Sequence, residues 1–78
     1  MDRKEYRRRL GQRPNAVRMD ELHQLLNLYG WELVTVRGSH HVYMLAGHRQ
    51  LVIPHRRPTI LGIYVRRALK ETEPQDAD

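Results

Sequence analysis

Three short runs of residues, rich in β-branched side chains and joined by very short connections, constrain the fold of this chain most. We predict β-strands over residues 31–36, 40–45 and 50–53. Gly38-Ser39 leaves room only for a tight turn, residues 46–49 form a short hairpin loop, and Pro54 ends the third strand. Because connections this short join antiparallel strands, the sequence predicts a three-stranded antiparallel meander.

Two stretches with helical periodicity flank these strands. The first is predicted over residues 19–29 and ends before Gly30, with a stripe formed by Leu22, Leu25, Leu26 and Tyr29. The second follows Pro58, which suits a first helical turn, with a stripe formed by Leu61, Tyr64, Val65, Ala68 and Leu69. Each helix must bury its apolar face. We therefore expect an α+β fold of order α-β-β-β-α, with both helices on one face of the sheet, as in double-stranded-RNA-binding domains.

Charge and helix-breaking residues divide the chain into three parts. Residues 1–18 carry seven basic and two acidic side chains, and Pro14 interrupts any helix begun there. We expect residues 1–16 to form a flexible Arg-rich arm, residues 17–71 the compact domain, and residues 72–78 a disordered acidic tail.

Composition narrows the possible functions. The 78 residues include no cysteine, which excludes disulfides and thiolate metal sites and fits a reducing, cytoplasmic setting. No apolar run approaches the roughly 18 residues of a membrane span, so no membrane partner is expected. A chain this small offers a surface groove, not a deep cavity. Its net charge of +5 favours anionic partners such as nucleic acid or an acidic protein.

The chain contains five histidines, and they differ in how well their positions suit a functional site. His40 follows the Gly38-Ser39 turn, where the backbone can approach a ligand closely, although spacing alone favours an exposed residue at a strand end. His41 points to the opposite face of the strand and receives no role. His55, before two arginines, is expected to contact phosphate. His23 and His48 are expected to be solvated and inert.

A histidine in a basic groove suggests RNA chemistry. The RNA 2′-hydroxyl is a built-in nucleophile, an imidazole can take its proton, and cations can stabilise the charge that develops on phosphorus. The histidines lack metal-ligand spacing, so no metal and no cofactor is expected. Two or three phosphate contacts are expected from Arg37, Arg49, Arg56, Arg57, Arg66 and Lys70.

Several motifs resemble the HicA family of bacterial toxins over residues 19–71. They are Tyr29-Gly30-Trp31, the run from Arg37 to Tyr43 with its Gly-Ser-His core, Val52-Ile53-Pro54-His55, and the last helix with Thr59-Ile60-Leu61 and residues 65–70. The resemblance implies the same fold and an endoribonuclease: an mRNA interferase that is the toxin of a type II toxin–antitoxin module and inhibits translation. Its implied partners are mRNA and a HicB-type antitoxin, in a possible higher-order complex in a bacterial or archaeal cytoplasm.

Carried over by motif, the implied catalytic residue is His40. The RNA-binding residues predicted around it are Gly38, Ser39, Arg37, His55, Arg56 and Arg57. Two alternatives remain open from the sequence. One is an RNA-binding module that does not cleave, and the other is a basic interaction domain for an acidic protein.

Overall fold

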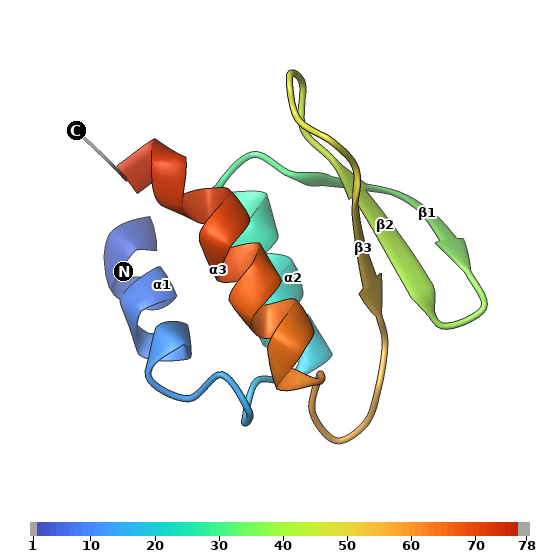
Figure 1. Cartoon of the computed structure of the whole chain (residues 1–78), viewed down its shortest axis with the longest axis horizontal. Coiled ribbons are helices and arrows are strands. Elements are labelled where there is room, and N and C mark those ends of the chain that lie inside the picture. The colour runs from blue at the N-terminus through green and yellow to red at the C-terminus, as the bar shows by residue number, and fades with distance from the viewer. Residues whose placement is uncertain (1, 77–78) are drawn as a thin grey trace.

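The computed structural model describes residues 2–76 as three helices and one three-stranded sheet (Figure 1). The elements are α1 (Arg3–Gly11), α2 (Met19–Leu28), β1 (Glu32–Arg37), β2 (His40–Met44), β3 (Leu51–Pro54) and α3 (Gly62–Asp76). Residue 1 of the predicted arm and residues 77 and 78 of the predicted tail lie outside the described residues. No helix within residues 2–76 is long and apolar enough to cross a membrane.

The sheet has the order β1-β2-β3, and both strand pairs are antiparallel. This confirms the predicted α+β class and the meander. His41 pairs with Ile53 and Tyr43 with Leu51, and both β3 partners are buried. Because paired residues share a face, His41 and Tyr43 both lie on the helix-covered face of β2. His40 and Val42 therefore lie on the open face.

The core lies between the sheet and the helices α2 and α3, which contact each other on one side of the sheet (Figure 1). The predicted stripe of α2 is confirmed, since Leu22, Leu25 and Leu26 are all fully buried. Gly30 has a φ of +87°, which lets the Trp31 N–H turn back and donate to the Leu26 carbonyl at 2.9 Å. Trp31 thereby enters the core at the point where β1 begins.

The N-terminal segment differs from the predicted flexible arm. Residues 3–11 form α1, which packs against α2 and α3 on their side away from the sheet (Figure 1). Asp2 caps this helix by accepting the Glu5 N–H at 2.9 Å, and Leu10 is buried. The Tyr6 hydroxyl donates to the Glu21 carbonyl of α2 at 3.0 Å. The helix is therefore held by specific contacts, although few of its residues are apolar.

The C-terminal helix also differs from its predicted bounds. It begins at Gly62, four residues after Pro58, because the Ile60 N–H first donates to the Val17 carbonyl at 2.8 Å. A Cβ at Gly62 would lie 1.9 Å from Asn15 Oδ1, so a glycine lets the loop between α1 and α2 approach the helix. The helix continues to Asp76, into the predicted disordered tail. Thr72 within that stretch is fully buried, and its hydroxyl donates to carbonyls one turn earlier.

Candidate active site

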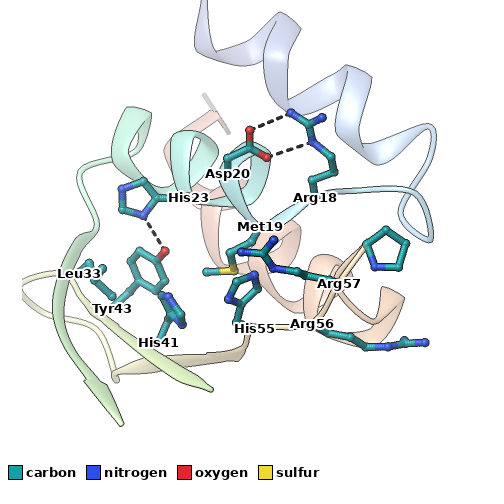
Figure 2. Close-up of a pocket in the computed structure, with 11 residues that line it drawn as sticks. Arg18, Met19, Asp20, His23, Leu33, His41, Tyr43, His55, Arg56 and Arg57 are labelled. Carbon is teal, nitrogen blue, oxygen red and sulfur yellow. Dashed lines mark hydrogen bonds and ion pairs between the residues drawn. The ribbon is translucent and has the colours of Figure 1, made fainter. Parts of the chain in front are cut away.

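An open cleft of about 810 Å³ lies where the start of α2, the sheet and the loop after β3 meet (Figure 2). Its walls are formed by Arg18, Met19, Asp20 and His23, by Leu33, His41 and Tyr43, and by residues 55–58. This volume lies in the range of ordinary small-ligand sites, which is about 300–1,000 Å³. A nucleotide-sized segment of a larger ligand can therefore enter it.

Two histidines from neighbouring strands meet in this cleft. The rings of His41 and His55 lie edge to face, with their centroids 5.4 Å apart and an interplanar angle of 88°. The backbone carbonyl of Ser39 contacts both residues. It accepts the His55 backbone N–H at 2.6 Å and lies 3.3 Å from His41 Nδ1. One carbonyl in the Gly-Ser turn therefore positions both histidines.

The Ser39 contact also sets the tautomer of His41. A carbonyl oxygen only accepts hydrogen bonds, so Nδ1 of His41 must carry the proton that it donates. In the neutral ring, Nε2 then keeps its lone pair and can accept a proton from a ligand. Gly38, with a φ of +59°, makes the tight turn that aims this carbonyl back at β2 and β3.

A second polar pair closes the inner end of the cleft. His23 Nδ1 lies 2.7 Å from the Tyr43 hydroxyl, and His23 Nε2 lies 2.9 Å from the Asn27 amide nitrogen. Figure 2 shows His23 and Tyr43 joined in this way. Burial raises the pKa of Tyr43 to about 12, so the phenol stays protonated under physiological conditions. Both nitrogens of His23 are thus engaged, and this residue orients Tyr43 instead of facing a ligand directly.

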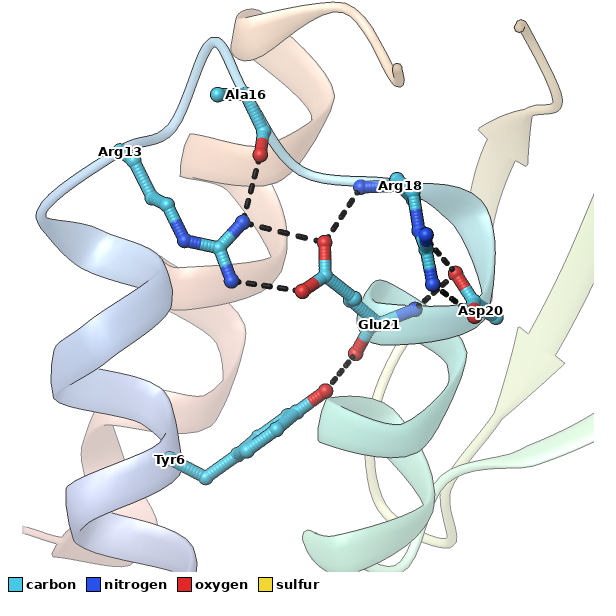
Figure 3. Close-up of polar contacts among 6 residues, drawn as sticks. All are labelled: Tyr6, Arg13, Ala16, Arg18, Asp20 and Glu21. Atoms are coloured by element: carbon cyan, nitrogen blue, oxygen red, sulfur yellow. Dashed lines mark hydrogen bonds and ion pairs between the residues drawn. The ribbon is translucent and has the colours of Figure 1, made fainter. Parts of the chain in front are cut away.

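The cations around the cleft differ in their availability. Arg18 donates to the carboxylate of Asp20, with 2.8 Å between Arg18 Nη2 and Asp20 Oδ2 (Figures 2 and 3). This contact holds the pKa of Asp20 below its usual range. Arg56 and Arg57 are exposed, and within residues 2–76 neither forms an ion pair. They are therefore free to contact an anionic ligand.

The structure divides the predicted site residues into two groups. His55, Arg56 and Arg57 line the cleft, and Ser39 and Gly38 form the turn that positions the two histidines. His40 and Arg37 do not line it. They are paired with each other across β1 and β2, and both are exposed on the open face of the sheet. The predicted divergence of His40 and His41 is confirmed, but it is His41 that faces the cleft.

Sequence reasoning assigned no role to three residues that form this site: His41, His23 and Tyr43. The signal for His41 was the spacing of two from Tyr43, which puts both on one face of a strand. The signal was ambiguous because Val42 and Met44 make the other face equally apolar. No sequence pattern indicated a role for His23, because its partner Tyr43 is twenty residues away in sequence.

The arrangement offers proton transfer and positive charge. Across the described residues, no three His, Cys, Asp or Glu side chains converge as ligands for a metal ion. Two imidazoles, an exposed pair of arginines and an apolar floor instead suit a phosphodiester.

Of three comparisons with known proteins, the one with protein-family models found a match. A sequence model of the family described as HicA toxin of bacterial toxin–antitoxin systems matches residues 19–73. Searches of curated proteins and of solved structures each found no match. The matched segment covers α2, the whole sheet and most of α3, and so it includes every residue of the cleft except Arg18.

Proposed function

The chain belongs to the HicA family of toxins of bacterial toxin–antitoxin systems, and we propose that it acts as an RNA-cleaving toxin, with the cleft as its active site. Its substrate is mRNA in the cytoplasm, and cleavage inhibits translation. The observation that carries this proposal is the meeting of His41 with His55 beside two exposed arginines.

In this mechanism His41 is the general base. Its Nδ1 proton is committed to the Ser39 carbonyl, which leaves Nε2 to take the proton of an RNA 2′-hydroxyl. The resulting oxygen attacks the adjacent phosphorus, the bond to the 5′-oxygen breaks, and a 2′,3′-cyclic phosphate forms. Positioned acid–base groups of this kind contribute about 10²–10⁴-fold to a rate.

The arginines after His55 supply the charge that this step needs. As phosphorus becomes five-coordinate, negative charge grows on its non-bridging oxygens, and cationic donors stabilise that charge. Arg56 and Arg57 come from the loop that forms one wall of the cleft, next to the histidines. Arginine is suited to this role because its planar guanidinium can bind two phosphate oxygens at once.

The motif carried over from the family indicated His40 as the catalytic histidine. The exposure of His40 and its place on the open face favour His41 instead. Both assignments predict RNA cleavage and differ only in which variant abolishes it. Gly38 and Ser39 serve the turn under either assignment, and Arg37 is a candidate for holding RNA outside the cleft.

Family membership also supports a protein partner. We infer that a HicB-type antitoxin inhibits the toxin, and that its acidic groups compete with RNA for the basic rim of the cleft. In that case a purified antitoxin raises the apparent Kd for RNA in proportion to its concentration. RNA affinity that is unchanged at a saturating antitoxin concentration would contradict competition at this rim.

The test of the proposed function is cleavage of a labelled RNA in EDTA by the purified chain. We expect cleavage that leaves a 2′,3′-cyclic phosphate and a 5′-hydroxyl, and none at a position carrying a single 2′-deoxy substitution. Salt-sensitive binding without cleavage would instead identify an RNA-binding module. Weak, salt-insensitive RNA binding would identify a domain that only meets an acidic protein.

A further inference from the structure

The second histidine of the cleft is not explained by phosphate binding alone. His55 is half-buried and its ring lies edge to face with that of His41, although Arg56 and Arg57 already supply positive charge beside it. A cleavage reaction that uses a base at the 2′-oxygen also needs an acid at the leaving 5′-oxygen. Without that acid, an alkoxide would have to leave unprotonated.

The Ser39 carbonyl ties the two histidine positions together. It accepts the backbone N–H of His55 and the ring N–H of His41, so moving the end of β3 away from β2 would break the contact with His55. Fixed geometry of this type is what a two-group proton transfer requires, because the base and the acid act on oxygens bonded to one phosphorus.

We propose that His55 is a second catalytic residue, the general acid that protonates the leaving 5′-oxygen while His41 accepts the 2′-proton. This inference rests on the proposed RNA cleavage. One proton moves from the 2′-hydroxyl to His41, and one moves from the His55 imidazolium to the 5′-oxygen. The bond from the 2′-oxygen to phosphorus forms as the bond to the 5′-oxygen breaks. Solvent then exchanges the protons and restores both rings.

The other polar groups of the cleft are unsuited to this transfer. The Tyr43 phenol is buried, its pKa is raised to about 12, and its hydroxyl is held by His23. His23 itself is bonded at both nitrogens, to Tyr43 and to Asn27. Within residues 2–76, by contrast, neither ring nitrogen of His55 forms a hydrogen bond.

The charged groups are equally unsuited. Asp20 is bound by Arg18, which favours its carboxylate form and leaves it no proton to give. Arg56 and Arg57 keep their protons in proteins, so they stabilise charge but do not act as acids. Of the three histidines that line the cleft, His41 and His55 are the two with a ring nitrogen that forms no hydrogen bond within residues 2–76. An imidazole is the side chain that can both take and give a proton.

A change of leaving group tests this assignment. The substrate is an RNA whose linkage at a mapped cleavage position carries sulfur in place of the bridging 5′-oxygen. A thiol is far more acidic than an alcohol, so the thiolate departs without a proton from the enzyme. We expect His55→Ala to slow cleavage of the ordinary linkage by about 10²–10⁴-fold, and to leave the sulfur linkage cleaved at nearly the wild-type rate.

Two controls isolate the role of His55. His41→Ala should slow both linkages, because the 2′-proton must be removed in each case. His48→Ala, in the hairpin loop away from the cleft, should alter neither. The ratio of the two rates within one variant is independent of the fraction of protein that is folded. If His55→Ala folds poorly, the ratio of the two rates still shows whether His55 acts as the acid. The same ratio can be measured in His55→Asn, whose side chain is closer in shape to histidine.

The outcomes separate this inference from the proposed function. Equal slowing of both linkages by His55→Ala would overturn the assignment and make His55 a phosphate-binding residue. Unchanged cleavage of both linkages would overturn it as well. If the wild type binds RNA but cleaves neither linkage, the proposed function itself falls, and the assignment falls with it.

Discussion

The arginine-rich helix α1 and the loop after β3 carry the same charged groups in different surroundings. In α1, Arg7 donates to the Thr72 hydroxyl at 2.9 Å and to the Leu69 carbonyl, while Arg8 and Arg9 pair with Glu5. In the loop, Arg56 and Arg57 have no carboxylate partner within the described residues. A run of positive charge in a sequence is therefore a poor guide to a binding surface until its partners are known.

This contrast supports a structural role for α1 and the ligand-binding role that we propose for the loop. Arg13 has a structural role as well, because its guanidinium donates to the Glu21 carboxylate and to the Ala16 carbonyl where the chain enters α2 (Figure 3).

The largest expected effect is on stability, at the buried residue of α1. Leu10→Ala should lower the free energy of unfolding by about 2–5 kcal/mol, because it leaves a cavity between α1 and the other helices. Urea unfolding, followed by the fluorescence of the buried Trp31, measures this change. A loss below about 0.5 kcal/mol would mean that α1 adds nothing to the fold, and the contrast would fail.

A single arginine should show the same structural role on a smaller scale. Arg7→Met keeps most of the aliphatic stem but removes the donors to Thr72 and Leu69, and should cost about 1–3 kcal/mol. Arg8→Met is the matched control, since Arg8 is exposed and its ion pair with Glu5 lies within α1 itself. It should stay within about 1 kcal/mol of wild type. Equal losses in the two variants would contradict a specific role for Arg7.

The loop should show the opposite behaviour. Replacing Arg56 and Arg57 together by Gln should leave stability within about 0.5 kcal/mol, since both are exposed. RNA binding should become less dependent on salt. If each arginine contacts one phosphate of a single strand, the slope of log K against log salt flattens by about 1.4. A 2′-O-methyl RNA, which lacks the nucleophile, permits this measurement without cleavage.

The control for the loop is the double replacement of Arg8 and Arg9 by Gln. Glu5 neutralises part of their charge, so the salt slope should change much less. An equal flattening in both double variants would show that α1 and the loop bind RNA alike.

The smallest expected effect is on the stability of the fold at acidic pH. The Arg13 guanidinium, hydrogen-bonded to Glu21, holds the pKa of that carboxyl below its usual range. Because the folded pKa is the lower one, this contact stabilises the fold above the ordinary glutamate value of 4.5 and is lost as the pH falls through the folded pKa.

Glu21→Gln should therefore lower stability at neutral pH by at most about 1 kcal/mol and flatten the loss of stability on acidification. Glu73→Gln, at an exposed acid of α3, should leave the profile unchanged. Urea titrations at several pH values make the comparison. Parallel acid profiles for wild type and Glu21→Gln would exclude this contact as a source of stability.

Periodicity predicted much of this fold because apolar side chains must lie on one face to be buried. It placed α2 and all three strands within about a residue of their observed positions, and it separated His40 from His41. It did not identify α1, since a helix whose buried surface comes from Tyr6, Leu10 and arginine stems has little apolar periodicity. Periodicity could not predict the arrangement of the site, because Ser39 and His55 come into contact only when β2 and β3 pair.

The choice between the two adjacent histidines had the same limit. Strand alternation states that they diverge but not which one faces the helices. That depends on the register with Ile53 and Leu51 in β3. Motif resemblance indicates the first histidine after Gly-Ser, whereas the second is the one that lines the cleft.

We propose above all that His41 acts within the cleft that His55 and the loop after β3 line. The most direct measurement compares single-turnover cleavage of one RNA in EDTA by wild type, His41→Ala and His40→Ala. We expect His41→Ala to lose about 10²–10⁴-fold in rate and His40→Ala to stay close to wild type. Loss of cleavage in His40→Ala, with His41→Ala still active, would contradict it and move the catalytic site to the open face of the sheet.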